Sequence, residues 1–350
     1  MLEQAMTRSF LRPSRQTLAP CLRCQWRTFS TTHPRLAGSN PKDGQPPAKA
    51  SPSDSSEKAP LATSGEQETP APEAHPLANA PRRYGRRVDH FEPTALLRPI
   101  GMQQPPQAGQ NTGIDTRTIK QRRDDFVNWE KHLKRREELK EQMIRPYFRD
   151  WKNLDLHKGK TFLAPPRLFR HDKSLYFPNL FGRTLLKTTS LPRDTTPLLQ
   201  GKASVVTLFS GVWAENQALS FMSEKANPGL HEILKAHKGH AQLVRVNIED
   251  QSRLRYWLVR IMARWMRKSL LEENWGKYFM VRAGISDEIR ESIGYLNGKV
   301  GYVYLVDGDC KIRWAGSGDA NAEEVQSLTR GMTTLMTEMK NGVWGEGNLK

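Results

Sequence analysis

The sequence predicts an α/β domain in residues 166–345, in which helices flank a central mixed sheet of four to five strands. A β-branched, apolar run over 203–209 leads directly into a helical pattern, the strand-to-helix order of such folds. Apolar and polar residues alternate over 242–248, which indicates a second strand. The turn sequence Asp307-Gly308-Asp309 separates two apolar runs and indicates a hairpin. An extended arm and a long amphipathic helix are expected before this domain.

The expected elements follow the order β-α-β-α-(α)-β-β-α. In chain order they are strand 203–209, helix 214–225 with its resumption over 229–238, strand 242–248, helices 251–271 and 286–296, a hairpin of 300–306 and 311–315, and helix 322–340. The segment 176–185 is expected to form an edge hairpin or a docking strand. This order is that of a thioredoxin-like fold, in which the last hairpin and helix pack on a four-stranded sheet.

Residues 1–29 have the composition of a mitochondrial transit peptide. The first 30 residues contain five arginines, no lysine and one acidic residue, and hydroxyl residues are interspersed with large apolar ones. The sequence Arg27-Thr28-Phe29-Ser30 resembles a matrix-peptidase cleavage site, and a disordered basic tail is the alternative. Cleavage after Phe29 would remove Cys21 and Cys24. Cys310 would then be the remaining thiol, which excludes a disulfide framework.

The chain is strongly basic, with a formal net charge of +17. Removal of the expected transit peptide would lower this charge to about +13. Such a charge is typical of proteins that bind nucleic acid, an anionic membrane surface or an acidic partner. The sequence contains no apolar run of 18 residues, so no membrane span is expected.

Two further segments are expected before the domain. Residues 30–80 are rich in Pro, Ala and Ser and predict a disordered linker. Residues 81–165 predict an irregular arm together with an amphipathic helix over 116–145, capped by Asp115 and ended by Pro146. The apolar stripe of this helix is narrow, so it suits either one partner surface or the chain's own domain.

The turn after the first expected strand is where a thioredoxin-like oxidoreductase carries its cysteines. Here the turn reads Ser210-Gly211-Val212-Trp213-Ala214-Glu215-Asn216-Gln217, which contains no cysteine and two residues, Ser210 and Asn216, that can cap a helix. Lys299-Val300-Gly301-Tyr302 stands where such enzymes place a cis-proline. Cys310 is expected to remain a thiol because it neighbours Asp309. No catalytic residue is therefore assigned, and a thiol oxidoreductase is the weaker alternative.

No metal site and no cofactor are predicted. His231, His237 and His240 lie near the end of one expected helix, but their spacing does not ensure that they converge. The sequence Gly316-Ser317-Gly318-Asp319 lacks the lysine of a phosphate-binding loop, and a helix cap at Asp319 or Asn321 explains it.

The expected helix over 251–271 combines basic and apolar residues. At about 100° per residue, four arginines form one row, and we expect the neighbouring stripe of Leu254, Leu258, Ile261 and Trp265 to be buried. Three interpretations remain open: a core helix with a solvated basic side, a membrane-surface helix at anionic headgroups, and a dock for a partner. Trp213 either contacts a partner or packs on the adjacent hairpin. The candidate contacts with a partner or a membrane are Trp213, Arg253, Trp257, Arg260, Arg264 and Arg267.

A series of motifs along residues 96–345 carries a family resemblance. They are Leu97-Arg98-Pro99-Ile100-Gly101, Pro105-Pro106, Gly109-Gln110-Asn111-Thr112-Gly113, Tyr147-Phe148-Arg149-Asp150-Trp151, His157-Lys158-Gly159-Lys160, Tyr176-Phe177-Pro178-Asn179-Leu180 and the segment 209–217. In this order they resemble the fungal mitochondrial ATPase complex assembly factor of the ATP-ten family.

The resemblance implies a thioredoxin-like chaperone, peripheral on the matrix side of the mitochondrial inner membrane, without catalytic residues or cofactors. It implies that the partners are ATP synthase subunit a (subunit 6) and the subunit c ring of the proton-translocating sector. An anionic lipid surface is a further expected contact, and nucleic acid is not. The alternative from composition is an RNA- or ribosome-associated basic matrix protein, although the aromatic strand motif of the common RNA-binding sheet is absent.

Overall fold

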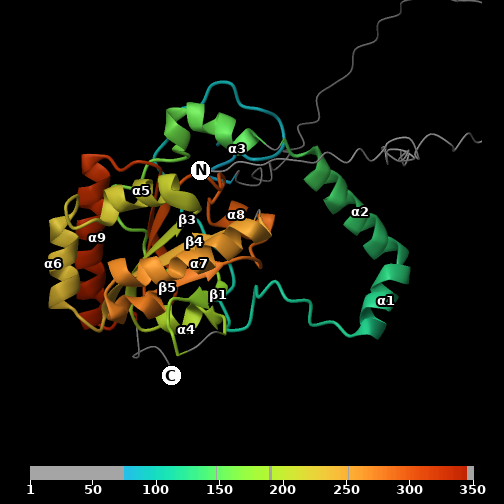
Figure 1. Cartoon of the computed structure of the whole chain (residues 1–350). Helices are drawn as coiled ribbons and strands as arrows, with labels where there is room; N and C mark the ends of the chain where they lie inside the picture. The colour runs from blue at the N-terminus through green and yellow to red at the C-terminus, as the bar shows by residue number, and fades with distance from the viewer. Residues whose placement is uncertain (1–74, 147, 189–190, 251, 345–350) are drawn as a thin grey trace, which may run out of the picture. The chain divides into compact units, whose positions relative to one another are not determined.

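A mixed sheet lies at the centre of the structure (Figure 1). The computed structural model describes residues 75–146, 148–188, 191–250 and 252–344. Within these residues the sheet has seven strands, in the order β2-β1-β5-β4-β3-β6-β7. The expected transit peptide over 1–29 and most of the expected linker over 30–80 lie outside the described residues.

The strand pairing defines the fold class. The strands are β1 (Phe181–Thr184), β2 (Arg193–Asp194), β3 (Ala203–Phe209), β4 (Ala241–Ile248), β5 (Tyr278–Val281), β6 (Tyr302–Val306) and β7 (Ile312–Ser317). β3 pairs in parallel with β4 and antiparallel with β6, which pairs antiparallel with β7. The order β4-β3-β6-β7 is that of the predicted thioredoxin-like core, so the fold class is confirmed. The sheet is larger than the four to five strands predicted.

The additional strands carry little signal in the sequence. All four side chains of β5 are buried, so the strand has no alternation of apolar and polar residues. β5 pairs in parallel with β4 and antiparallel with β1. β2 has only two residues and pairs with β1 at the edge of the sheet. Short segments of this kind are not separated from loops by periodicity.

The helices lie between the strands in the predicted order along the chain. They are α1 (Ile119–Val127), α2 (Trp129–Ile144), α3 (Arg149–Lys152), η1 (Asn153–Asp155), η2 (His157–Gly159), α4 (Thr196–Leu199), α5 (Gly211–Met222), α6 (Pro228–Ala236), α7 (Arg253–Ser269), η3 (Glu272–Lys277), α8 (Asp287–Ser292) and α9 (Ala322–Lys340). Asn321 caps α9 together with Glu324, in agreement with the expected cap. In the described residues, no helix has both the length and the apolar content that a membrane span requires.

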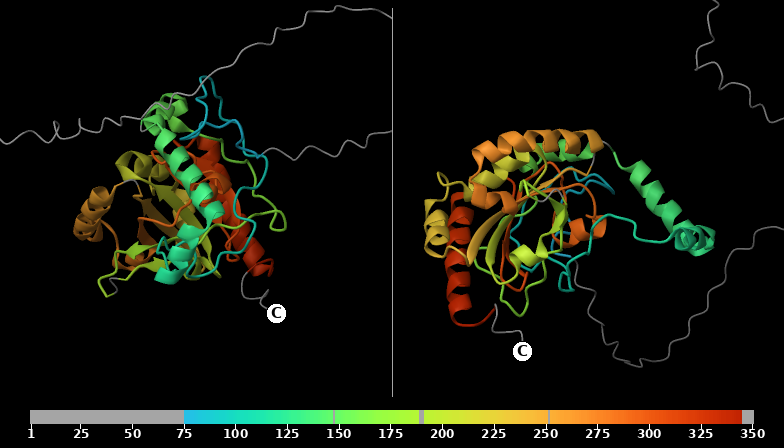
Figure 2. Two further views of the ribbon diagram at one scale, coloured as in Figure 1. Left: turned by 90° about the vertical axis from the view of Figure 1, so that its right-hand side faces the viewer. Right: turned by 60° about the horizontal axis from the view of Figure 1, so that its bottom comes forward.

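Two layers of side chains cover the sheet. On one face, α5 packs on β3 and β6, α9 packs on β3, β6 and β7, and α6 packs on β4 and lies beside α9 in both Figure 1 and Figure 2. α7 packs on the same face over β3 and β5, in a cluster that includes Ala214 and Ala263. The other face is covered by α8 and by irregular segments that precede the sheet in the chain. From the expected arm, Leu96 and Ile100 are buried in this second layer.

The segment expected to form one helix over 116–145 forms two helices. Asn128 ends α1 and begins α2, and its side chain accepts a hydrogen bond from the amide of Lys131. α1 begins after Thr118, which forms a capping box with Gln121, and Asp115 instead pairs with Arg117. No residue of α1 is buried, and outside 141–142 every side chain of α2 is exposed. Asn128 therefore acts as a cap where a continuous helix was expected.

Candidate interaction surface

The turn from β3 into α5 presents apolar side chains to solvent. Val212 and Trp213 are 69% and 55% exposed, so more than half of the surface of each side chain is open to solvent. Gly211 has a φ of +83°, which favours glycine at this position. Ser210 occupies the cap position, but its hydroxyl donates to Oε2 of Glu249 over 3.4 Å instead of accepting from the helix. The start of α5 is therefore an exposed corner with a tryptophan.

The loop before β6 closes over this corner. The amide of Gly301 donates to Oε1 of Gln217 over 3.0 Å, and Nε2 of Gln217 donates to the carbonyl of Lys158 over 3.1 Å. A Cβ atom at Gly301 would lie 2.2 Å from the carbonyl oxygen of Ala214. The described residues contain no cis peptide bond. The place of the catalytic cis-proline is thus taken by a glycine packed against α5.

A group of charged side chains lies behind the same corner, at the carboxyl end of β4. Glu249 is buried, and burial raises the pKa of its carboxyl group. Arg255 lies 3.9 Å from it. Burial lowers the pKa of Lys299, whose ammonium group lies 5.6 Å from the ring centroid of Trp151. Burial also raises the pKa of Asp150.

Sequence reasoning missed this charged group. Glu249 and Asp250 directly follow a strand that ends at the sheet edge where α/β folds place polar sites, which is the signal that could have found them. Asp250 pairs with the buried Arg290. The group combines both signs of charge behind the exposed corner, and no cysteine takes part in it.

Cys310 lies on the β6–β7 hairpin, away from α5. It is buried, at 1% exposure. Burial raises the pKa of its thiol to about 12, and the nearby Asp307 and Asp309 act in the same direction. At neutral pH the group is therefore a protonated thiol without access to solvent, as expected from its neighbours.

The inward side of α7 differs from the side that the sequence predicted. Ala263 is buried, and Tyr256, Val259, Met266 and Leu270 pack with it against the sheet. The stripe expected to be buried is exposed instead. The reason is that α7 has two apolar sides, and periodicity alone does not tell which of them contacts the sheet.

The outward side of α7 is apolar along the whole helix. Six apolar side chains on this side are each between 46% and 72% exposed. We call this set the α7 outer face: Leu254, Trp257, Leu258, Ile261, Met262 and Trp265. An isolated exposed apolar residue is ordinary, but a contiguous set on one helix is typical of an interaction site.

Arginines border the α7 outer face, and they differ in what they contact. Arg253, Arg260 and Arg264 are exposed and form no ion pair with any described residue. Arg267 is half-buried, and its Nε donates to the carbonyl of Leu185 over 2.6 Å. Of the predicted arginine row, three members face solvent and the fourth ties α7 to the end of β1.

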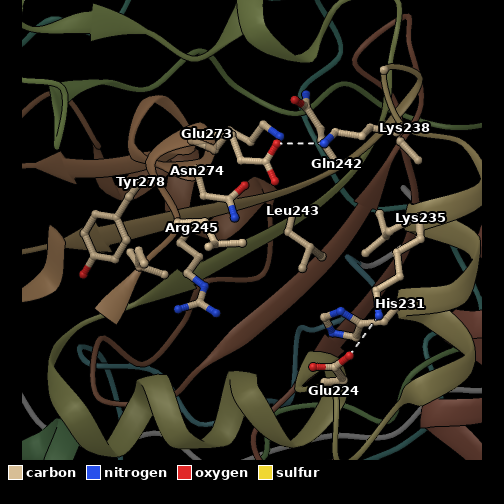
Figure 3. A pocket seen from close by; sticks show the side chains of 16 residues that line it. Glu224, His231, Lys235, Lys238, Gln242, Leu243, Arg245, Glu273, Asn274 and Tyr278 are labelled. Carbon is tan, nitrogen blue, oxygen red and sulfur yellow. Dashed lines mark hydrogen bonds and ion pairs between the residues drawn. The ribbon is translucent and has the colours of Figure 1, made fainter. Parts of the chain in front are cut away.

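A separate pocket of about 400 Å³ opens between α6, β4 and η3 (Figure 3). Figure 3 shows Leu243 and Arg245 of β4 between the side chains of α6 and those of η3. Lys235 pairs with Glu224 and Lys238 with Glu273, each over 3.0 Å. The other sides of the pocket are therefore lined by paired charges, and none of the predicted contact residues lines it.

The pocket and its surroundings contain the histidines singled out by the sequence. A ring nitrogen of His231 lies 2.7 Å from the carbonyl of Met222, and one of His237 lies 3.2 Å from that of Ile233. Beside the pocket, the carboxyl group of Glu215 lies 4.0 Å from Arg245, and burial raises its pKa. In the described part of the chain, no three His, Cys, Asp or Glu side chains are grouped so that they could bind a metal ion.

The sequence profile of the family described as ATP10 protein matches residues 85–335. The chain belongs to the ATP10 protein family. The match includes α5, α7 and Cys310, so the corner without a cysteine lies within the part of the chain that defines membership.

Fungal members of the ATP10 family are similar over most of their length. A mitochondrial ATPase complex subunit ATP10 from Eremothecium gossypii is 32% identical over 234 residues, which cover 67% of this chain and 82% of that protein. The protein of the same description from Saccharomyces cerevisiae is 28% identical over 246 residues, which cover 67% and 84% of the two chains.

Solved structures similar to this ATP10 family member share little sequence with it. A DsbF homologue from Corynebacterium diphtheriae is 13% identical and covers 48% of this chain and 90% of its own, with a TM-score of 0.30. The thioredoxin-like class of this chain therefore rests on its own strand order.

Proposed function

We propose that the chain is an assembly factor of the mitochondrial ATP synthase that acts as a chaperone for subunit a (subunit 6) and assists its incorporation with the subunit c ring. The observation that carries the proposal is family membership, because the fungal relatives are described as mitochondrial ATPase complex subunits. The exposed apolar surfaces of the domain support a binding role. Subunit a is expected to be hydrophobic, and apolar surface in water costs about 25 cal/mol per Å² until it is covered.

The proposed activity is binding and not catalysis. The turn at the start of α5 has no cysteine, and the only cysteine among the described residues is buried with a raised pKa. A thiol–disulfide exchange requires an accessible thiolate, which Cys310 does not provide at neutral pH. The same corner instead offers Trp213, a side chain typical of protein interfaces.

We place the protein on the matrix side of the inner membrane as a peripheral protein. The composition of residues 1–29 supports import into mitochondria, and the newly made membrane subunit would be met at the matrix face. We propose Trp213, Trp257, Arg253, Arg260 and Arg264 as contacts with the partner or the membrane, with Arg267 keeping α7 in place through Leu185.

The arm helices supply a second surface for the same role. α1 and α2 expose Ile119, Phe126, Trp129 and Met143, each by more than two thirds. These side chains lie on helices that are otherwise rich in charge, so a narrow apolar stripe is left without cover. In the proposal, this stripe and the surface around α5 and α7 cover the partner until it reaches the ring.

Depletion of the protein from mitochondria tests the proposal. Native gel electrophoresis with antibodies to subunit a and to the c ring should show both proteins still synthesised, but with subunit a absent from the assembled ATP synthase. Re-expression of the wild-type chain should restore assembly, and so should the Cys310→Ala variant. A general loss of mitochondrial translation products would instead support the RNA- or ribosome-associated alternative. Loss of assembly with Cys310→Ala would support a thiol-dependent one.

A further inference from the structure

α7 has two apolar sides, and only one of them is used by the domain. Leu254, Leu258, Ile261 and Trp265 recur at helical spacing and form one continuous outward stripe. This stripe lies opposite Ala263, which is buried against the sheet. A helix of 17 residues is about 25 Å long, so the stripe is an extended surface and not a single anchoring point.

The charges on α7 are of one sign. Between residues 253 and 269 there are six arginines and lysines and no acidic residue. At about 100° per residue, Arg253, Arg260 and Arg264 fall within about 40° of one another along one border of the stripe. Arg255 lies along the opposite border. α7 therefore has an apolar centre with an arginine row along one border, while the opposite border carries Arg255 alone, 3.9 Å from Glu249.

Three kinds of occupant could cover such a face. A second copy of the chain would bring two arginine rows together, which opposes self-association. A protein helix would need an apolar centre and acidic residues at positions that match the arginine row. An anionic bilayer has an apolar interior, and its negatively charged headgroups continue in every direction of the membrane plane. It can therefore contact both the apolar stripe and the arginines of α7 without any particular alignment of residues.

The positions of two tryptophans on α7 are consistent with contact with a bilayer. Trp257 and Trp265 are 54% and 72% exposed and lie two turns apart on the outer face. Tryptophan is enriched at the boundary between headgroups and acyl chains, because its ring is apolar and its N–H group can contact water or headgroups. Arginines at the borders can reach the phosphates while the stripe enters the interface.

We propose that the α7 outer face is an interfacial membrane-binding surface for anionic phospholipid, with the helix axis parallel to the bilayer plane. The inference rests on the proposed location at the inner membrane. Beyond that location, the inference names α7 as the segment that contacts the membrane and gives the orientation of its axis relative to the bilayer. Trp213 then remains available for the protein partner.

Flotation with vesicles and lipid photolabelling test the surface in the full chain. Wild-type protein should float with phosphatidylcholine vesicles that contain cardiolipin, less so at high salt, and not with vesicles of phosphatidylcholine alone. Replacing three arginines by glutamate (Arg253→Glu, Arg260→Glu, Arg264→Glu) should weaken binding by at least about 100-fold. The matched control makes the same charge change at exposed residues outside α7: Arg167→Glu, Lys173→Glu and Lys225→Glu. Its binding should remain close to that of the wild type.

An apolar variant tests the stripe itself. Leu254→Ser, Ile261→Ser and Trp265→Ser change exposed side chains, so the circular dichroism spectrum should be that of the wild type while flotation is lost. In wild-type protein, a photoreactive phospholipid should label peptides of the α7 outer face. Unchanged flotation of both variants, or labelling confined to other segments, would overturn the inference.

The same variants separate this inference from the proposed function. If they float normally but fail to restore assembly of subunit a, the α7 outer face is a protein-binding surface, and the inference is wrong while the proposed function stands. If they lose flotation and the depleted mitochondria assemble ATP synthase normally without any copy of the protein, lipid binding stands and the proposed function is wrong.

Discussion

The amide of Gly301 donates a hydrogen bond to Oε1 of Gln217 over 3.0 Å and so ties the loop before β6 to α5. This contact occupies the place where a thioredoxin-like oxidoreductase positions a cis-proline beside its cysteines. The backbone of the loop and the backbone of α5 are close enough that only glycine fits between them. The loop before β6 and α5, the helix that carries Trp213, are therefore held closely together.

Gly301→Ala should strongly destabilise the domain. The added Cβ would lie 2.2 Å from the carbonyl oxygen of Ala214, and a backbone atom of a helix cannot move aside as a side chain can. We expect a loss of about 3 kcal/mol in the free energy of unfolding, measured by urea denaturation. Gly276→Ala is the control, because its nearest neighbour, Cδ1 of Leu186, would lie at 3.6 Å. Equal effects of the two substitutions would contradict the close packing of the loop.

Lys160→Met should cost about 3–5 kcal/mol of stability. Nζ of Lys160 lies 2.6 Å from Oε2 of Glu324, and the two side chains are 9% and 6% exposed, so removal of the amine leaves a buried carboxylate without its counter-ion. Chemical denaturation measures the effect. The exposed pair of Lys235 and Glu224 is the comparison, and Lys235→Met should leave stability unchanged within error. A Lys160→Met variant as stable as the wild type would show that this pair does not hold the segment at Lys160 to α9.

Arg267→Ala and Arg264→Ala should have different consequences although both remove an arginine from α7. Arg267 donates to the carbonyl of Leu185, so its loss should cost about 1–2 kcal/mol in the free energy of unfolding. Arg264 is exposed and has no ion pair among the described residues, so its removal should weaken vesicle binding without changing stability. A stability loss with Arg264→Ala, or none with Arg267→Ala, would reverse these assignments.

The thiol of Cys310 should make stability fall at alkaline pH. Its pKa is raised to about 12 in the folded state, against about 8.5 for a free thiol. At pH values between these two, unfolding therefore releases the proton of the thiol. The stabilisation is complete below the unfolded pKa and is lost as the pH rises toward the folded one. Between pH 7.5 and pH 10, wild-type protein should lose about 2 kcal/mol more than Cys310→Ala.

Alkylation provides a direct check on this burial. At neutral pH, iodoacetamide should leave the peptide that contains Cys310 unmodified until the protein is unfolded, as read by mass spectrometry. Rapid modification of the native protein, or identical pH dependence for both variants, would show that the thiol is accessible.

The central elements could be predicted from the sequence because local pattern and tertiary role coincide there. Residues 203–209 are β-branched and apolar, and they form β3 over the predicted range. The capped, amphipathic segment 322–340 forms α9 over its predicted range. β5 was missed because all its side chains are buried, and Asn128 was missed because the charge pattern continues through it.

The candidate site could be predicted only in part, because local pattern and tertiary role coincide there for some residues and not for others. The residue types of α7 predicted an amphipathic helix with a row of arginines, and the structure has both. Which apolar side faces the sheet depends on tertiary contacts with β3 and β5, which the periodicity of α7 does not encode, and that prediction was wrong. The group around Glu249 and Lys299 is brought together from separate segments, so its only local signal is the position of Glu249 and Asp250 directly after β4.

Site-specific photocrosslinking at the corner of α5 tests the central claim most directly. A photoreactive phenylalanine analogue in place of Trp213 is irradiated in intact mitochondria, and the crosslinked chain is identified by mass spectrometry. The same analogue in place of the exposed Lys225 on the segment after α5 is the control. The account predicts an adduct with subunit a at position 213 and none at position 225. Equal labelling at both positions, or an adduct at position 213 with a ribosomal protein, would contradict it.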